Sequence, residues 1–85
     1  MFEIHIDNQP GDFLQKLDEK LQRRIIRKID SLKDNPFPNN SKRVINREDK
    51  TFRIRVGDYR VLYVVFQKEK GILISKIDKR SRAYD

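Results

Sequence analysis

The sequence contains no cysteine and only one histidine, His5, among its 85 residues. Disulfide bonds, thiolate nucleophiles and cysteine-based zinc or iron–sulfur sites are therefore excluded, and so is a histidine-rich metal centre. Any chemistry must use carboxylates, tyrosine, lysine, arginine, serine or threonine. We accordingly expect neither a metal ion nor a cofactor.

Glycine, proline and long apolar runs are also scarce. The chain has three Gly and three Pro and is 36% hydrophobic and 39% charged, so we expect one folded domain over residues 1–85. No apolar run approaches the roughly 20 residues of a membrane span. The start, MFEIHIDNQP, lacks the basic and apolar regions of a signal peptide. These features predict a cytoplasmic protein that does not bind a membrane.

Basic residues outnumber acidic ones, which gives a formal net charge of +7. The excess is uneven: residues 1–50 carry eleven basic and nine acidic side chains, whereas residues 51–85 carry nine and four. A basic surface attracts polyanions and binds them with release of counterions. The distribution therefore predicts an anionic partner for the second half of the chain.

The first half of the chain has the periodicity of one strand and two helices. Residues 2–6 alternate apolar and polar side chains, as a half-buried strand does, with Glu3 and His5 on the wet side. After a turn over residues 7–11 we expect a short helix around residues 13–17.

A longer helix should follow, with Asp18 as its N-cap and an end before Asn35-Pro36. Its apolar residues recur at spacings of three and four and predict a stripe facing the core: Leu21, Ile25, Ile29 and Leu32. Its basic flank is either a solvated surface or an RNA contact.

From Lys42 the pattern changes to strands, in the runs KRVIN, TFRIRV, YRVLYVVF and ILISKI. We therefore predict an α+β fold. It has an N-terminal strand, two helices forming a hairpin, and three to four antiparallel strands in a twisted sheet with the helices on one side.

Two of these strands are predicted to form a hairpin, because Gly57-Asp58 is a two-residue loop that suits a type II′ turn. In this register Arg55 lies directly opposite Arg60, and Arg53 lies opposite Leu62. Like charges in opposed positions destabilise a sheet, so an anion is expected there. Arginine suits that role because its guanidinium grips a phosphate in bidentate fashion. Alternatively, the long side chains splay into water, where salt screens their repulsion.

A second basic cluster follows the last strand, in the run DKRSRAYD. Basic side chains with an interleaved aromatic are typical of single-stranded RNA recognition, and Tyr84 could stack on a base or donate a proton. Tyr84 could instead pin the chain's end onto the body. The candidate RNA contacts are Arg53, Arg55, Lys76, Lys79 and Arg82.

The helix ending in Asn-Pro, the hairpin FRIRVGDYRVLY and the closing run DKRSRAY closely resemble the RelE branch of the RelE/ParE superfamily of toxin–antitoxin systems. The resemblance covers essentially the whole chain. It implies a RelE-like fold, a ribosome-dependent endoribonuclease that cuts messenger RNA, and a cognate RelB-like antitoxin. It also implies a catalytic set at the matching positions, which are Arg53, Arg55, Arg60, Arg80 and Tyr84.

We hypothesise that Arg60 and Arg80 bind the phosphate and stabilise its added charge, while Arg53 and Arg55 position the backbone. The products would carry a 2′,3′-cyclic phosphate and a 5′-hydroxyl. The proton acceptor is left open because a guanidinium is a poor base. Glu48 and Asp49 could supply a base, or they could be ordinary loop carboxylates. Two other functions also fit: a ParE-like inhibitor of DNA gyrase and a non-catalytic RNA-binding module.

Overall fold

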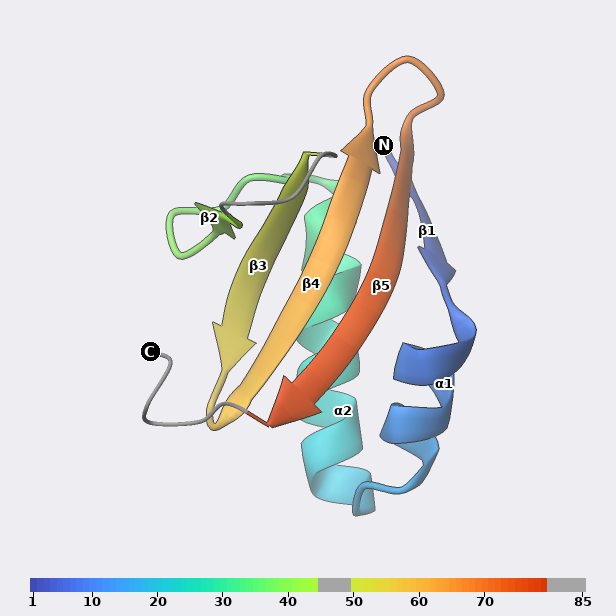
Figure 1. Cartoon of the computed structure of the whole chain (residues 1–85), viewed down its shortest axis with the longest axis vertical. Coiled ribbons are helices and arrows are strands. Elements are labelled where there is room, and N and C mark those ends of the chain that lie inside the picture. Colours follow the sequence, from blue (N-terminus) through green and yellow to red (C-terminus); the bar gives the residue numbers. More distant parts are fainter. Residues whose placement is uncertain (45–49, 80–85) are drawn as a thin grey trace.

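The computed structural model describes residues 1–44 and 50–79. Figure 1 shows the elements, which follow one another as β1 (Glu3–Ile6), α1 (Asn8–Gln15), α2 (Glu19–Asp30), the 3₁₀ turn η1 (Ser31–Lys33), β2 (Lys42–Arg43), β3 (Thr51–Val56), β4 (Tyr59–Phe66) and β5 (Gly71–Lys79). The predicted α+β class and the order of its elements are confirmed.

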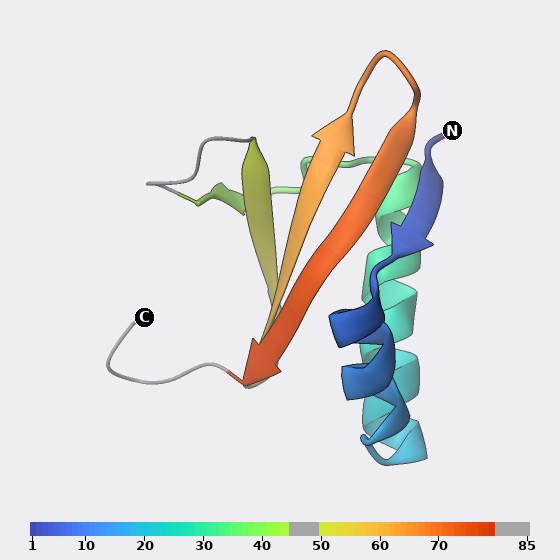
Figure 2. The ribbon, with the colours of Figure 1, turned by 45° about the vertical axis from the view of Figure 1, so that its right-hand side comes forward.

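The five strands form one sheet in the order β1-β5-β4-β3-β2. Strand β1 pairs with β5 in parallel, whereas the other three pairs are antiparallel, so the sheet is mixed. Both helices lie on the same side of this sheet, as predicted, and the ribbon of the other side is left uncovered by helices (Figure 2). We call that other side the open face.

Helix α1 begins earlier than predicted, and the expectation of a turn over residues 7–11 was wrong. Asp7 is the N-cap, and its carboxylate accepts a hydrogen bond from the backbone N–H of Asn8 at 2.8 Å. Pro10 is the third helical residue, where a missing N–H is harmless because the first turn's N–H groups have no intrahelical acceptor. The Pro-Gly pair therefore lies inside a helical turn.

Helix α2 follows the predicted pattern. The Asp18 carboxylate accepts a hydrogen bond from the N–H of Leu21 at 2.8 Å and caps the helix. Ile25, Ile29 and Leu32 are at most 2% exposed and form part of the core that the helices and the sheet share. The predicted apolar stripe is thus confirmed.

The hairpin of β3 and β4 has the predicted register, with Arg55 opposite Arg60 and Arg53 opposite Leu62. Gly57 has a φ of +59°, and Lys70 is the only non-glycine residue of the described chain with a positive φ. A positive φ at the first loop position alone agrees with a type II′ turn. Ile54, the neighbour of both β3 arginines, is fully buried against the helices.

Strand β5 contains a bulge that changes its register against β4. Tyr63 lies opposite Ile74, but the preceding Leu62 lies opposite Lys76, so Ser75 is the extra residue. Beyond the bulge, the Gln9 side chain holds the backbone of Ile77, whose C=O accepts a hydrogen bond at 2.9 Å and whose N–H donates one at 3.0 Å. Gln9 therefore fixes β5 past the end of β1.

Candidate functional site

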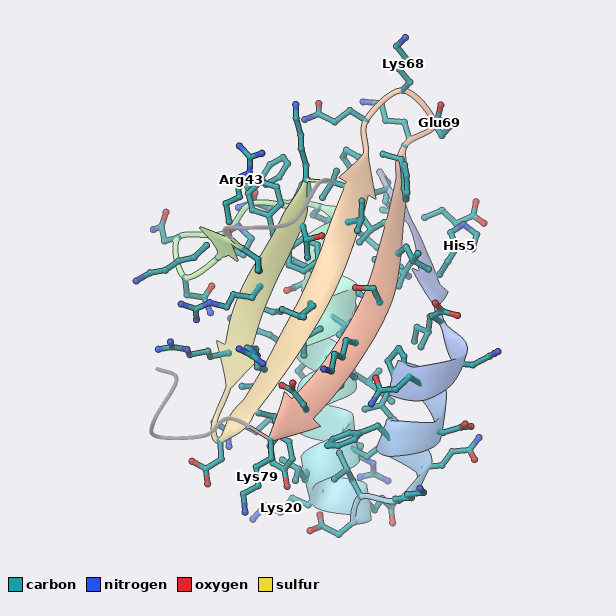
Figure 3. All side chains as sticks on the ribbon, in the orientation of Figure 1. His5, Lys20, Arg43, Lys68, Glu69 and Lys79 are labelled. Atoms are coloured by element: carbon teal, nitrogen blue, oxygen red, sulfur yellow. The ribbon has the colours of Figure 1, made fainter. Side chains whose placement is uncertain are left out.

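Cationic side chains gather on the open face of the sheet in two rows that cross the strands. The register aligns Lys42, Arg53, Leu62 and Lys76 in one row, and Arg55, Arg60 and Asp78 in the next. Along β3, β4 and β5 these residues alternate with those of the core that the sheet shares with the helices, so their side chains stand on the side away from the helices. Figure 3 views the molecule from this side. We define the arginine face by its charged members, which are Lys42, Arg53, Arg55, Arg60, Lys76 and Asp78.

An ion pair lies at the centre of the second row. Arg60 donates from Nε to Oδ1 of Asp78 at 3.1 Å and from Nη2 to Oδ2 at 2.9 Å. The two side chains are 29% and 25% exposed, so the pair is partly shielded from water. A bidentate pair of this kind fixes the plane of the guanidinium and uses two of its five N–H groups.

Asp78 also moderates the repulsion that the sequence predicts between Arg55 and Arg60. Lys76 approaches the same carboxylate, with 3.7 Å between its Nζ and Oδ2 of Asp78. The arginine face still holds five cations against one carboxylate, so it keeps an excess of positive charge. It can therefore attract an anion, and the arginine guanidinium can bind a phosphate or a carboxylate in bidentate fashion.

Apolar residues lie between the charges of the arginine face. Leu62 stands between Arg53 and Lys76 in its row and is 4% exposed, and Val64, two residues further along β4, is 8% exposed. Long basic side chains bury their aliphatic stems on such residues and keep the charged ends outside. The arginine face therefore combines charge with an apolar floor.

Lys79 is not brought to the arginine face. The register places it opposite Tyr59, whose ring contacts Phe13 of α1 edge to face at 5.8 Å between centroids. Lys79 thus lies at the end of β5 on the side of the helices, and its label is at the lower end of the sheet in Figure 3. The other predicted site residues lie outside the described part of the chain: Arg80, Arg82 and Tyr84, together with Glu48 and Asp49.

Sequence reasoning missed two members of the arginine face, Lys42 and Asp78. Lys42 was predicted to be in a strand, but no sequence pattern indicated that it pairs with Arg53 of the neighbouring strand β3. Asp78 did leave a signal, because the apolar spacing in β5 changes from two at Ile72 and Ile74 to three at Ile77. Such a break in alternation indicates a bulge and thereby a change of register.

The described residues contain no group of three or more His, Cys, Asp or Glu side chains that could hold a metal ion. In the same part of the chain, no helix has the length and apolar character that crossing a membrane requires.

A protein-family model described as "ParE toxin of type II toxin-antitoxin system, parDE" matches residues 6–84. The chain is also 38% identical over 58 residues to a Methanocaldococcus jannaschii protein named as toxin RelE1. That match covers 66% of this chain and 64% of the relative, so the chain spans less than two thirds of the relative's length.

Solved structures of toxin–antitoxin proteins have the same fold. A chain of the archaeal RelE-RelB complex from Pyrococcus horikoshii OT3 is 33% identical, with a TM-score of 0.84 over 95% of this chain and 97% of that one. The Mycobacterium tuberculosis complex RelBE2 gives a TM-score of 0.80 at 21% identity over 93% and 98% of the two chains. The isolated E. coli RelE toxin gives 0.79 at 18% identity over 99% and 92%. At 21% and 18% identity, the likeness to the last two structures concerns the fold alone.

Proposed function

Because the chain belongs to the RelE/ParE superfamily, as a RelE-family toxin of a type II toxin–antitoxin system, we propose that it cleaves messenger RNA on the ribosome. The observation that carries this proposal is the arginine face, where five cations and one carboxylate surround an apolar floor on the open face of the sheet. Such a face suits a strand of RNA, which presents both phosphates and bases.

Cleavage by the 2′-hydroxyl requires that this hydroxyl lose its proton, that the phosphorane charge be stabilised and that the 5′-oxygen be protonated. Arg60 stabilises the charge, because a preoriented donor aimed at a developing negative charge lowers the barrier. Arg53 and Arg55 hold the flanking backbone, and Lys42 and Lys76 lie at the two ends of the row that contains Arg53. The products are a 2′,3′-cyclic phosphate and a 5′-hydroxyl.

Asp78 acts in this proposal as a positioning residue and not as the base, because both of its oxygens accept hydrogen bonds from Arg60. Arg80 and Tyr84 complete the proposed site, Arg80 as a second phosphate ligand and Tyr84 in base stacking or proton transfer. Lys76, on the arginine face, and Arg82 are proposed as further RNA contacts. Lys79 lies on the side of the helices and would contact RNA only where the RNA extends beyond the arginine face.

A RelB-like antitoxin is the proposed protein partner, because solved relatives with this fold include complexes of RelE with RelB. An antitoxin that masks the arginine face would prevent cleavage. Co-expression with a neighbouring antitoxin gene, followed by co-purification, tests this partner. A chain that is harmless when expressed alone and that captures no antitoxin would contradict it.

Primer extension on ribosome-bound message, with and without the purified chain, tests the function directly. We expect new stops within codons exposed in the decoding site, and none on the same message without ribosomes. The matching family model bears the name of ParE, so inhibition of DNA gyrase is the second candidate. Inhibited supercoiling with uncut message would establish that candidate in place of the nuclease. RNA binding with neither effect would leave a non-catalytic RNA-binding module.

A further inference from the structure

A recess at the edge of the sheet is lined mostly by residues that have no role in the function proposed above. Its volume is about 380 Å³, and it lies between α2 and the end of β3. It is lined by Arg24, Arg27, Lys28, Ser31, Asn40, Arg55, Val56 and Gly57. Strand β2 pairs only with Phe52 and Arg53, so it does not cover this end of β3.

The lining of the recess is strongly basic. Among residues 1–44 and 50–79, the lining contains four cations and no carboxylate, and no acidic side chain forms an ion pair with Arg24, Arg27 or Lys28. Arg24 and Arg27 are three residues apart, and Arg24 and Lys28 are four apart, so these like charges repel one another along the helix. Nearby Arg23 differs, because Glu19 pairs with it.

The recess is also joined to the arginine face. Arg55 belongs to both, since it stands opposite Arg60 on the sheet and lines the recess. On the other wall the Arg24 guanidinium lies against the hairpin turn, where a methyl group built on Gly57 would be 3.3 Å from Nη1 of Arg24. A continuous basic path therefore leads from the open face around the end of β3 to α2.

We propose that this recess binds a phosphodiester group of RNA, so that RNA bound on the arginine face continues around the edge of β3 to α2. The inference rests on the proposed RNA substrate. Arg24 and Arg27 would grip the phosphate oxygens, and the Asn40 amide would add a neutral donor. The Ser31 hydroxyl already donates to the carbonyl of Lys28 at 2.6 Å, so it is assigned no role.

RNA is favoured over an acidic peptide because Arg55 joins the cations of the recess to those of the arginine face, where the RNA substrate is proposed to bind. The recess and the arginine face together offer positive charge along a path that turns around a strand edge, and a regularly charged backbone can match such a path. Message and ribosomal RNA share this chemistry, so the phosphodiester group can come from either. The test below separates them.

Arg27→Gln tests the recess, and Arg23→Gln is its matched control. Both remove one positive charge from the exposed side of α2, but only Arg27 lines the recess. The probe is a short single-stranded RNA with 2′-O-methyl groups, which cannot be cut by its own 2′-hydroxyl. Arg27→Gln is expected to weaken binding about tenfold and to lower the slope of log K against log salt by about one. Arg23→Gln should weaken it by less than about threefold.

Equal losses for the two variants would overturn the proposal, because net charge alone would then explain binding. Binding to ribosomes without message is the second measurement. If Arg27→Gln selectively weakens this binding, ribosomal RNA is the ligand of the recess. If Arg27→Gln weakens only the binding of the oligonucleotide, the message is the ligand. A selective loss of antitoxin binding alone overturns the RNA assignment.

Message cleavage by the unmodified chain is scored separately from these binding measurements. If the message stays uncut but Arg27→Gln selectively weakens RNA binding, the proposed nuclease activity is contradicted and the proposed RNA site in the recess is supported. If the message is cut but Arg27→Gln does not selectively weaken RNA binding, the nuclease activity is supported and the RNA site in the recess is contradicted.

Discussion

The two faces of the sheet hold opposite kinds of residue, although the same strands build both. On the side of the helices Ile54, Val61 and Tyr63 are fully buried. On the open face their neighbours Arg55 and Arg60 stand in a charged row with an ion pair. Because side chains alternate along a strand, one strand supplies both core residues and residues of the proposed RNA-binding site. Substitutions on the helix side should therefore change stability, and those on the open face should change RNA chemistry.

Ile54→Ala should have the largest effect, because it leaves a cavity between the sheet and the helices. We expect a loss of about 3 kcal/mol in the free energy of unfolding, measured by urea denaturation. Arg55→Ala is the matched control, one residue further along β3 but on the open face, and should cost less than about 1 kcal/mol. Equal losses would mean that the two faces are not energetically distinct.

Arg60→Ala should slow message cleavage about 100-fold while the chain stays folded, because one charge-stabilising donor contributes about 2.7 kcal/mol or more to the barrier. The measurement is a primer-extension time course on ribosome-bound message. Lys68→Ala, in the exposed turn between β4 and β5, is the control and should cleave at the normal rate. Undiminished cleavage by Arg60→Ala would remove Arg60 from the proposed site.

Asp78→Asn should separate binding from chemistry. The change removes the negative charge of the arginine face and loosens the guanidinium of Arg60. We expect tighter, more salt-dependent binding of RNA but cleavage about 10-fold slower, because a misplaced group loses much of its effect. In a chain that already carries Arg60→Ala, the same substitution should change the cleavage rate little, because the two residues act as one unit. Additive losses in cleavage would contradict the positioning role.

Much of the fold could be predicted because its signals are local. The Asp18 cap, the apolar stripe of α2 and the alternation around Gly57 each depend on a few consecutive residues, and all agree with the structure. The start of α1 was mispredicted because Pro10 and Gly11 suggested a turn, whereas the Asp7 cap starts the helix. Proline is compatible with both states at that position, so composition alone does not decide between them.

The site was only partly predictable because it combines local and distant pairings. A two-residue loop determines that Arg55 faces Arg60. The partner of Arg60 across β4 and β5 depends instead on the bulge at Ser75, which brings Asp78 into register. If Ser75 paired with Leu62 in regular register and formed no bulge, Asp78 would face Tyr59 on the side of the helices. The roles of Arg80 and Tyr84 come from resemblance and stay predictions.

Tyr63→Phe tests the stability of the helix side of the sheet and should have the smallest effect, because it removes a single hydroxyl. The Tyr63 hydroxyl donates to the carbonyl oxygen of Pro36 at 2.7 Å, and its loss should cost about 1 kcal/mol in urea denaturation near neutral pH. Burial raises the pKa of Tyr63 above its ordinary value of 10.0. The folded chain therefore holds this proton more tightly than the unfolded chain does.

The stability that this proton contributes is present below pH 10.0 and is lost as the pH rises through the folded-state pKa of Tyr63. The unmodified chain should accordingly lose more stability above pH 10.0 than Tyr63→Phe does, so the difference between the two should shrink there. Lysines titrate in the same range in both proteins, so only this difference reports on the hydroxyl. A constant difference across that range would show that the hydroxyl titrates alike in the folded and unfolded chains.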